Sequence, residues 1–140
     1  MRVAVFPDPL VLAHAAADEA ASRVRAAIAA HGRTRIVAAT GMSQLAFLDR
    51  LIRELNLDWS KVGLRHLDEY VGLPADHPAS FRKYLRERLI DPTGIVNLHL
   101  IDGGDDPDVA CEEVGRALAA LFLDADCSSL PTPEHLLAHQ

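Results

Sequence analysis

One turn of the sequence combines a glycine with two hydroxyl side chains. Thr40, Gly41, Met42 and Ser43 follow an apolar run typical of a buried strand and precede a run with helical spacing. A glycine at such a turn lets the backbone approach a ligand, and the free N–H groups and positive end of the next helix attract a phosphate. The hydroxyl groups of Thr40 and Ser43 add donors. The sequence therefore predicts a phosphate-binding turn, and the alternative is a structural turn in which Ser43 caps the helix.

Two adjacent carboxylates follow another apolar run. Asp68 and Glu69 come directly after residues 62–67, at the expected carboxyl end of a strand. Ligands of open α/β sheets bind at this edge, and a carboxylate there can act as a general base if burial raises its pKa. The alternative is a loop acid that caps the backbone of residues 71–72 or pairs with Arg82. A phosphate-binding turn and a carboxylate base on one edge together describe a sugar-phosphate site.

The seven histidines do not show the spacing of a metal site. His66 precedes Asp68 by two residues, so the two side chains share a face if the strand persists. His77 lies in the loop that we expect above the site. A metal site would require His66, His77 and Asp68 to converge, and no ligand spacing in the sequence matches a known pattern. We therefore expect no metal.

The elements that position these residues alternate between apolar runs and helical periods. Four apolar runs predict strands, and helical spacing predicts helices between them and after Pro107. Strands separated by helices form right-handed βαβ units, so we expect an α/β fold with a parallel sheet. The predicted strands are residues 3–6, 35–39, 62–67 and 95–101, and the predicted helices include residues 10–31, the segment after the 40–43 turn and residues 79–89.

Each long helix carries an apolar stripe that we expect to be buried. The pattern is lost in the tail, residues 123–140, where prolines interrupt any helix, and we expect weak order there. The stripes comprise Leu10, Ala13, Ala17, Ala21, Val24 and Ile28 in the first helix, Leu45, Leu48, Leu51, Ile52 and Leu55 in the second, and Val114, Ala117, Leu118 and Leu121 in the last.

Composition narrows the class of protein. The chain has 140 residues, and 14 basic against 20 acidic side chains give a net charge of -6. This balance argues against a nucleic-acid-binding face and against an anionic-membrane patch, since both require a basic surface. Two cysteines without a C-x-x-C pattern indicate reduced thiols and a cytoplasmic location. No apolar segment is long enough for a membrane span, and residues 1–6 are too short for a signal peptide.

Several motifs together resemble the glucosamine-6-phosphate deaminases (isomerases). The string Asp-Glu-Tyr-Val-Gly-Leu-Pro at residues 68–74, followed by His-Pro-Ala-Ser-Phe at residues 77–81, is similar to the signature loop of that family. The Thr-Gly-x-Ser turn, Asp-Trp at residues 58–59 and Tyr-Leu at residues 84–85 resemble the same family at the same spacing. The resemblance covers about residues 1–122. The related 6-phosphogluconolactonases share the layout but usually carry Asp-Glu-Arg in the signature loop.

The resemblance implies a fold, an activity and site residues. The fold would be a Rossmann-like, three-layer parallel sheet with helices on both faces. The activity would convert glucosamine 6-phosphate into fructose 6-phosphate and ammonia without metal or organic cofactor, and homo-oligomers are common in the family. Asp68 would be the catalytic base that moves a proton between C2 and C1, and Glu69 would support the loop or the substrate. The turn residues that would hold the sugar and its phosphate are Thr40, Gly41, Met42 and Ser43.

The resemblance also implies a second half that we do not find after Phe122. Members of the family continue with a loop resembling Gly-x-Gly-x-x-Gly-His, which supplies the groups for ring opening. We therefore expect an apparently truncated fold, with residues 1–122 as the amino-terminal part of the domain and residues 123–140 as a divergent tail. The alternatives to a deaminase are a non-catalytic sugar-phosphate-binding module, an inactive fragment and a 6-phosphogluconolactonase-like hydrolase.

Overall fold

The computed structural model describes residues 3–53, 57–104 and 106–123. The chain divides into two compact units, residues 1–104 and residues 105–140. The first unit contains the sheet and both of the turns that the sequence predicts to carry the site.

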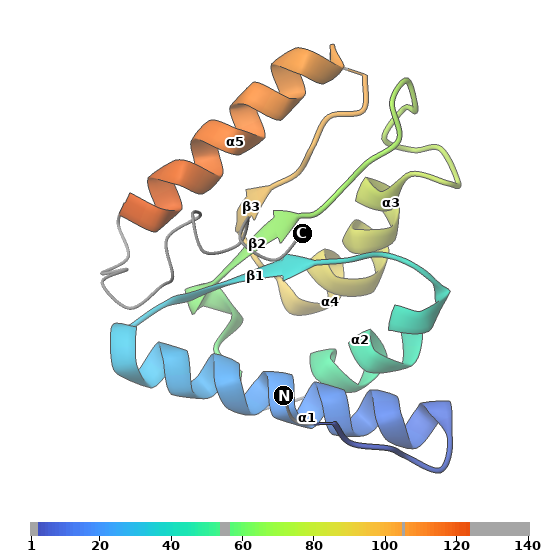
Figure 1. The fold of residues 1–140 in the computed structure, drawn as a ribbon, viewed down its shortest axis with the longest axis vertical. Helices are drawn as coiled ribbons and strands as arrows, with labels where there is room; N and C mark the ends of the chain where they lie inside the picture. Colours follow the sequence, from blue (N-terminus) through green and yellow to red (C-terminus); the bar gives the residue numbers. More distant parts are fainter. Residues whose placement is uncertain (1–2, 54–56, 105, 124–140) are drawn as a thin grey trace, which may run out of the picture. The chain divides into compact units, whose positions relative to one another are not determined.

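The sheet of the first unit has three parallel strands, in the order β1-β2-β3 (Figure 1). They are β1 (Thr34–Ala38), β2 (Val62–His66) and β3 (Asn97–His99). In the register of the sheet, Ala38 pairs with His66, and Leu64 pairs with Leu98 on its other side. The parallel α/β sheet confirms the predicted fold class, and three of the four predicted strands are present.

Helix α1 (Pro9–His31) begins and ends on local signals that the sequence carries. The Asp8 carboxylate accepts a hydrogen bond of 2.8 Å from the backbone N–H of Val11, and Pro9 fills the first position, where no N–H is needed. Gly32 ends the helix with a φ of 74°, a left-handed conformation that glycine adopts without steric cost. The predicted helix over residues 10–31 is thus confirmed.

The segment after the signature loop is helical but changes its winding. It begins as α3 (Phe81–Leu85), continues through a π-helical turn (Arg86–Ile90) and ends as α4 (Asp91–Thr93). A π turn contains an extra residue, and its last two residues, Leu89 and Ile90, are both buried in the core. The helix ends at Thr93, beyond the predicted end at Leu89, because Gly94 is the residue that adopts the left-handed conformation ending it.

The core lies on one face of the sheet. Leu64 on β2 is fully buried, and Ile36 and Leu98 on the neighbouring strands pack against the same cluster. Helix α2 (Leu45–Ile52) lies against α1 and adds its own apolar face. The helical residues of the cluster are Ala17, Ala21 and Val24 from α1, Leu48 and Leu51 from α2, and Leu85, Leu89 and Ile90 from the α3–α4 segment. On the opposite face of the sheet, Val37 is 57% exposed.

Two expectations from apolar patterning are wrong in the first unit of the chain. The predicted strand at residues 3–6 is irregular, with Val3 72% and Val5 92% exposed. A strand needs a neighbour for its backbone hydrogen bonds, and no strand of the described residues pairs with this segment. Leu10, the first residue of the predicted α1 stripe, is exposed because it lies in the first turn of the helix, away from the buried Ala13–Val24 stretch. Leu55 of the second stripe lies outside the described residues.

The second unit contains helix α5 (Pro107–Leu123). The carboxylate of Asp106 accepts a hydrogen bond of 2.9 Å from the N–H of Asp108, which satisfies a free donor at the start of the helix. Val114 and Ala117 of the predicted stripe are partly buried, whereas Leu118, expected to be buried, is 36% exposed. Within the described residues, no helix has the length and apolar character that crossing a membrane requires.

Candidate functional site

The two predicted site segments leave the sheet at the same edge. Ala38 and His66 are paired neighbours at the carboxyl ends of β1 and β2. Thr40 and Asp68 each lie two residues beyond that pair. Because adjacent strands lie about 4.8 Å apart, the structure brings both segments to the edge where ligands of α/β sheets bind.

The turn after β1 depends on Gly41. Its φ of 139° and ψ of 167° lie in a region that essentially only glycine occupies. The turn then forms a 3-10 helix at Met42–Gln44, closed by a hydrogen bond of 3.1 Å from the N–H of Gln44 to the carbonyl oxygen of Gly41. The sequence predicted this glycine-dependent turn, and its backbone conformation fits that prediction.

The side chains of the turn have different environments. Met42 is 82% exposed, and the exposed Ser43 hydroxyl makes no hydrogen bond within the described residues. The N-cap of the 3-10 helix is Gly41, without a side-chain bond, so Ser43 does not cap a helix as the structural alternative supposed. The Thr40 hydroxyl oxygen is buried and has no hydrogen-bond partner among the described groups.

Glu69 points into the protein. Its side chain is fully buried, and its two carboxylate oxygens accept four hydrogen bonds. Three come from the backbone N–H groups of Tyr70, Phe81 and Arg82, at 3.0, 3.0 and 2.8 Å, and the fourth from the Ser80 hydroxyl at 2.8 Å. Burial alone raises the pKa of this carboxyl, but the hydrogen bonds outweigh burial and lower the pKa from 4.5 to about 2. Glu69 therefore stays ionised and joins the signature loop to the start of α3.

Arg82 extends this connection to the loop after β3. Its guanidinium lies 3.5 Å from the Glu69 carboxylate and 2.8 Å from that of Asp102. It also donates a hydrogen bond of 3.2 Å to the carbonyl oxygen of Leu73. The alternative in which a loop acid pairs with Arg82 thus describes Glu69, although not Asp68. The result is one polar network that holds the loops after β2 and β3 together.

Gly103 lets these two loops approach closely. Its carbonyl oxygen accepts a hydrogen bond of 2.5 Å from the N–H of Gly72. A Cβ atom at position 103 would collide with the carbonyl oxygen of Tyr70. No larger residue fits here without moving the signature loop.

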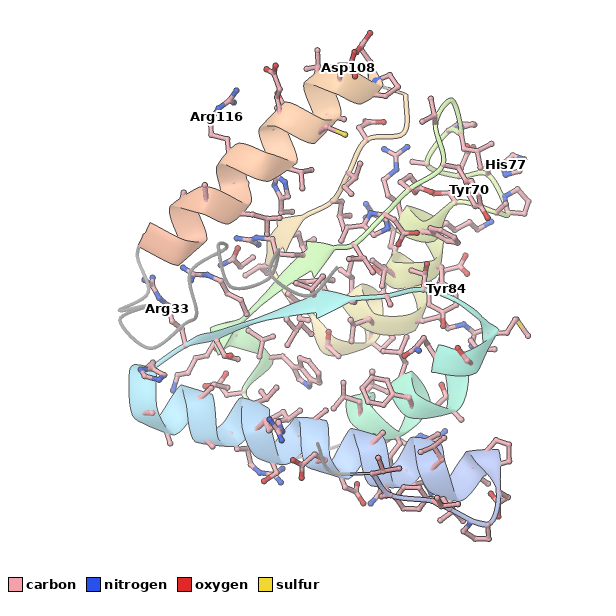
Figure 2. The ribbon with its side chains drawn as sticks, in the orientation of Figure 1. Arg33, Tyr70, His77, Tyr84, Asp108 and Arg116 are labelled. Carbon is pink, nitrogen blue, oxygen red and sulfur yellow. The ribbon has the colours of Figure 1, made fainter. Side chains whose placement is uncertain are left out.

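Tyr84 connects the turn after β1 to the same helix that Glu69 anchors. Tyr84, labelled in Figure 2, lies on α3. Its hydroxyl donates a hydrogen bond of 3.0 Å to the carbonyl oxygen of Gly41. Burial raises the pKa of Tyr84, so it remains a neutral donor. Phe81, which binds Glu69, and Tyr84, which binds Gly41, are separated by about 4.5 Å of helix rise. The two predicted site segments are therefore fixed on one short helix.

Asp68 differs from its neighbour. It is exposed, so the burial expected of a carboxylate base at this edge is not observed, and its carboxylate makes no hydrogen bond or ion pair within the described residues. Two adjacent carboxylates thus occupy opposite environments: Glu69 is saturated by protein donors, and Asp68 is available to a ligand.

His66 is a functional candidate whose burial the sequence analysis missed. It is 3% exposed, and neither ring nitrogen has a hydrogen-bond partner among the described residues. Burial lowers its pKa, the charges of Glu69 and Asp68 raise it, and Arg82 lowers it further. Burial dominates, so the imidazole is neutral at neutral pH. The two-residue spacing between His66 and Asp68 is the feature of the sequence that points to His66 as part of the site.

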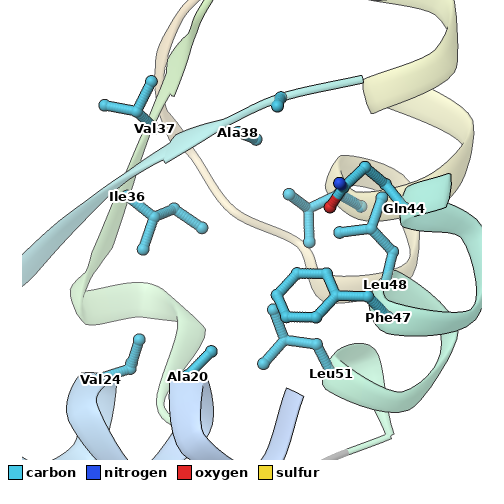
Figure 3. A pocket seen from close by; sticks show the side chains of 11 residues that line it. Ala20, Val24, Ile36, Val37, Ala38, Gln44, Phe47, Leu48 and Leu51 are labelled. Atoms are coloured by element: carbon cyan, nitrogen blue, oxygen red, sulfur yellow. The ribbon is translucent and has the colours of Figure 1, made fainter. Parts of the chain in front are cut away.

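An apolar cavity of about 280 Å³ lies next to the turn but does not include Asp68. Figure 3 shows its lining, to which α1, β1 and α2 contribute apolar side chains such as Val24, Ile36 and Phe47, while Gln44 contributes an amide. Such a lining lacks the donors that a sugar phosphate requires. Among the described residues, no three His, Cys, Asp or Glu side chains are grouped so that they could hold a metal ion.

Known protein sequences are similar to this chain. Residues 7–137 match the family model described as glucosamine-6-phosphate isomerases/6-phosphogluconolactonase. A glucosamine-6-phosphate deaminase from Streptomyces avermitilis is 32% identical over 126 residues, which is 86% of this chain and 47% of that protein. A second, from Streptomyces coelicolor, is 38% identical over 87 residues, or 57% of this chain and 33% of that protein. The chain thus spans about half the length or less of these curated relatives.

Solved structures share the fold. A monomeric glucosamine-6-phosphate deaminase superposes with a TM-score of 0.78 at 24% identity, covering 86% of this chain and 51% of that one. A 6-phosphogluconolactonase from Shewanella baltica superposes with a TM-score of 0.71 at 23% identity, covering 91% of this chain and 51% of that one. Both sister activities therefore occur on this fold.

Proposed function

Since the chain belongs to the family of glucosamine-6-phosphate isomerases and 6-phosphogluconolactonases, we propose that the carboxyl edge of its sheet binds a sugar phosphate. The turn at residues 40–43 supplies backbone N–H groups and hydroxyls for the phosphate and sugar, as turns before helices do. Hydrogen bonds from Tyr84 and to Glu69 hold that turn and the signature loop on one helix. The site is thus preorganised by residues that do not themselves face the ligand.

We further propose the chemistry of glucosamine-6-phosphate deaminases: isomerisation of glucosamine 6-phosphate and its deamination to fructose 6-phosphate and ammonia. Asp68 acts as the base that takes the proton from C2 and returns it to C1 through an enediol-type intermediate. The observation that carries this role is the contrast between the free carboxylate of Asp68 and the saturated one of Glu69. A base needs an accessible lone pair, and once a ligand excludes water, a single carboxylate can serve both carbons. No cofactor is required for this proton transfer.

A pair of variants tests the proposal. Glucosamine 6-phosphate is titrated into the chain by calorimetry, and ammonia release is followed by a coupled assay. Asp68→Asn keeps the shape of the side chain but removes the base, so we expect binding within about threefold of wild type and loss of turnover by 100-fold or more. Asp76→Asn, which changes an exposed carboxylate of the same loop, serves as the control and should retain both. Turnover that is unchanged in Asp68→Asn would exclude Asp68 as the base.

The family contains a second activity on the same fold, lactone hydrolysis, which the 6-phosphogluconolactonase neighbour represents. The signature string at residues 68–74 favours the deaminase because its third residue is Tyr70, not arginine. Assaying hydrolysis of 6-phosphogluconolactone beside ammonia release separates the two activities. Binding heat without either product would instead support a sugar-phosphate-binding module without turnover.

A further inference from the structure

His66 is a buried polar side chain that no described group satisfies. Both ring nitrogens are enclosed and have no partner among the described residues, although His66 stands at the carboxyl end of β2 beside the proposed site. The other side chains on this face of β2, those of Val62 and Leu64, are apolar and buried. An unpaired imidazole at such a position destabilises the fold, so its presence calls for a functional explanation.

The charged groups around His66 leave one acceptor for it. Glu69, Asp68 and Arg82 are the groups whose charges affect its pKa. Arg82 cannot accept a hydrogen bond, and the Glu69 oxygens already accept four. Asp68 has no partner among the described residues, and it lies two residues from His66, on the same face if the extended backbone continues.

We propose that His66 is a positioning residue for Asp68, an inference that rests on the proposed function. When a sugar phosphate covers the edge and excludes water, one imidazole N–H donates a hydrogen bond to the Asp68 carboxylate and fixes its orientation. One of the two side chains must rotate, because the described structure contains no such bond. A neutral donor suits this task, since a fixed positive charge beside the carboxylate would make it a weaker base.

The inference is tested by nuclear magnetic resonance on the whole chain labelled with ¹⁵N and ¹³C. The pKa and tautomer of His66 are read from its ring nitrogens, without and with saturating glucosamine 6-phosphate, and the Gly41 amide reports binding. We expect the ligand to raise the pKa of His66 by about one unit or more, as a hydrogen-bonded carboxylate does. The rise should disappear in Asp68→Asn and persist in the control Asp76→Asn.

The possible outcomes separate a failure of this inference from a failure of the proposed function. If the Gly41 amide responds while His66 does not, the positioning role is overturned and the proposed binding stands. If the rise persists in Asp68→Asn, it comes from the ligand's phosphate and the role is also overturned. If neither reporter responds, the proposed function fails and this inference fails with it.

Two substitutions at position 66 separate positioning from packing. His66→Gln keeps an N–H donor, and His66→Leu keeps the volume without one. We expect the leucine variant to melt at a higher temperature than wild type. We also expect it to lose the ligand-dependent change in the ¹³C chemical shift of the Asp68 carboxyl carbon. The glutamine variant should retain that shift. The same shift in all three proteins would contradict the inference.

Discussion

Glu69→Gln should destabilise the protein by an amount that depends on pH. Glu69 is ionised in the folded chain down to a pKa of about 2, compared with 4.5 for an unperturbed glutamate. One pKa unit corresponds to about 1.36 kcal/mol, so the ionised carboxylate stabilises the fold by about 3 kcal/mol at neutral pH. Because the folded pKa is the lower one, this stability is present above about pH 4.5 and is lost as the pH falls towards 2.

Urea unfolding of wild type and Glu69→Gln at pH 7, 4 and 2.5 measures the effect. Glutamine keeps the shape of the side chain. Its NH₂ group, however, would face the Ser80 hydroxyl and the Arg82 backbone N–H, which donate hydrogen bonds to the carboxylate in the wild type. We expect a difference of about 3 kcal/mol at pH 7 that shrinks strongly by pH 2.5. Asp68→Asn is the matched control and should change stability by less than about 0.5 kcal/mol, since it alters an exposed, unpartnered carboxylate. A difference that is the same at pH 7 and pH 2.5 would refute the electrostatic account of Glu69.

Two further predictions concern glycines. Gly41→Ala should lower the free energy of unfolding by about 1–3 kcal/mol through its backbone conformation alone, since a Cβ there would meet no described atom within 4 Å. Gly115→Ala is the control: its position is equally open but helical, so the substitution should stabilise the protein by about 1 kcal/mol. Chemical denaturation that ranks the two variants the other way would contradict this explanation. Gly103→Ala should cost about 2 kcal/mol or more and perturb the amide signal of Gly72, because its methyl collides with the Tyr70 carbonyl, whereas Gly104→Ala should leave that signal in place.

The strands and the first helix could be predicted because their determinants are local. Short continuous apolar runs locate β1 and β2 to within one residue at each end, and Asp8, Pro9 and Gly32 define the limits of α1. Residues 3–6 show the limit of such reasoning. Their apolar run is as clear as the others, but a strand forms only where a neighbour pairs with it.

The position of the candidate site in the fold could be predicted from the sequence, but the environment of each side chain could not. Strand order brings Gly41 and Asp68 to one edge, which follows from the βαβ pattern. The different environments of Asp68 and Glu69 do not follow from sequence, since both are acids in one loop. They depend on the N–H groups at the start of α3, which lie more than ten residues away and reach Glu69 only in the folded chain. The burial of His66 likewise depends on tertiary packing, which the local sequence does not determine.

The π-helical turn at Arg86–Ile90 holds one residue more than the same length of regular helix. Deleting one residue there would restore regular winding and leave the residues on either side on their present faces, so the path into β3 would keep its direction. Deleting one residue from a regular stretch such as α1 would instead rotate every later residue of that helix by about 100° around the axis. A one-residue gap at the π turn in an alignment with a related sequence therefore leaves the register between helix and sheet intact, whereas the same gap in α1 changes it.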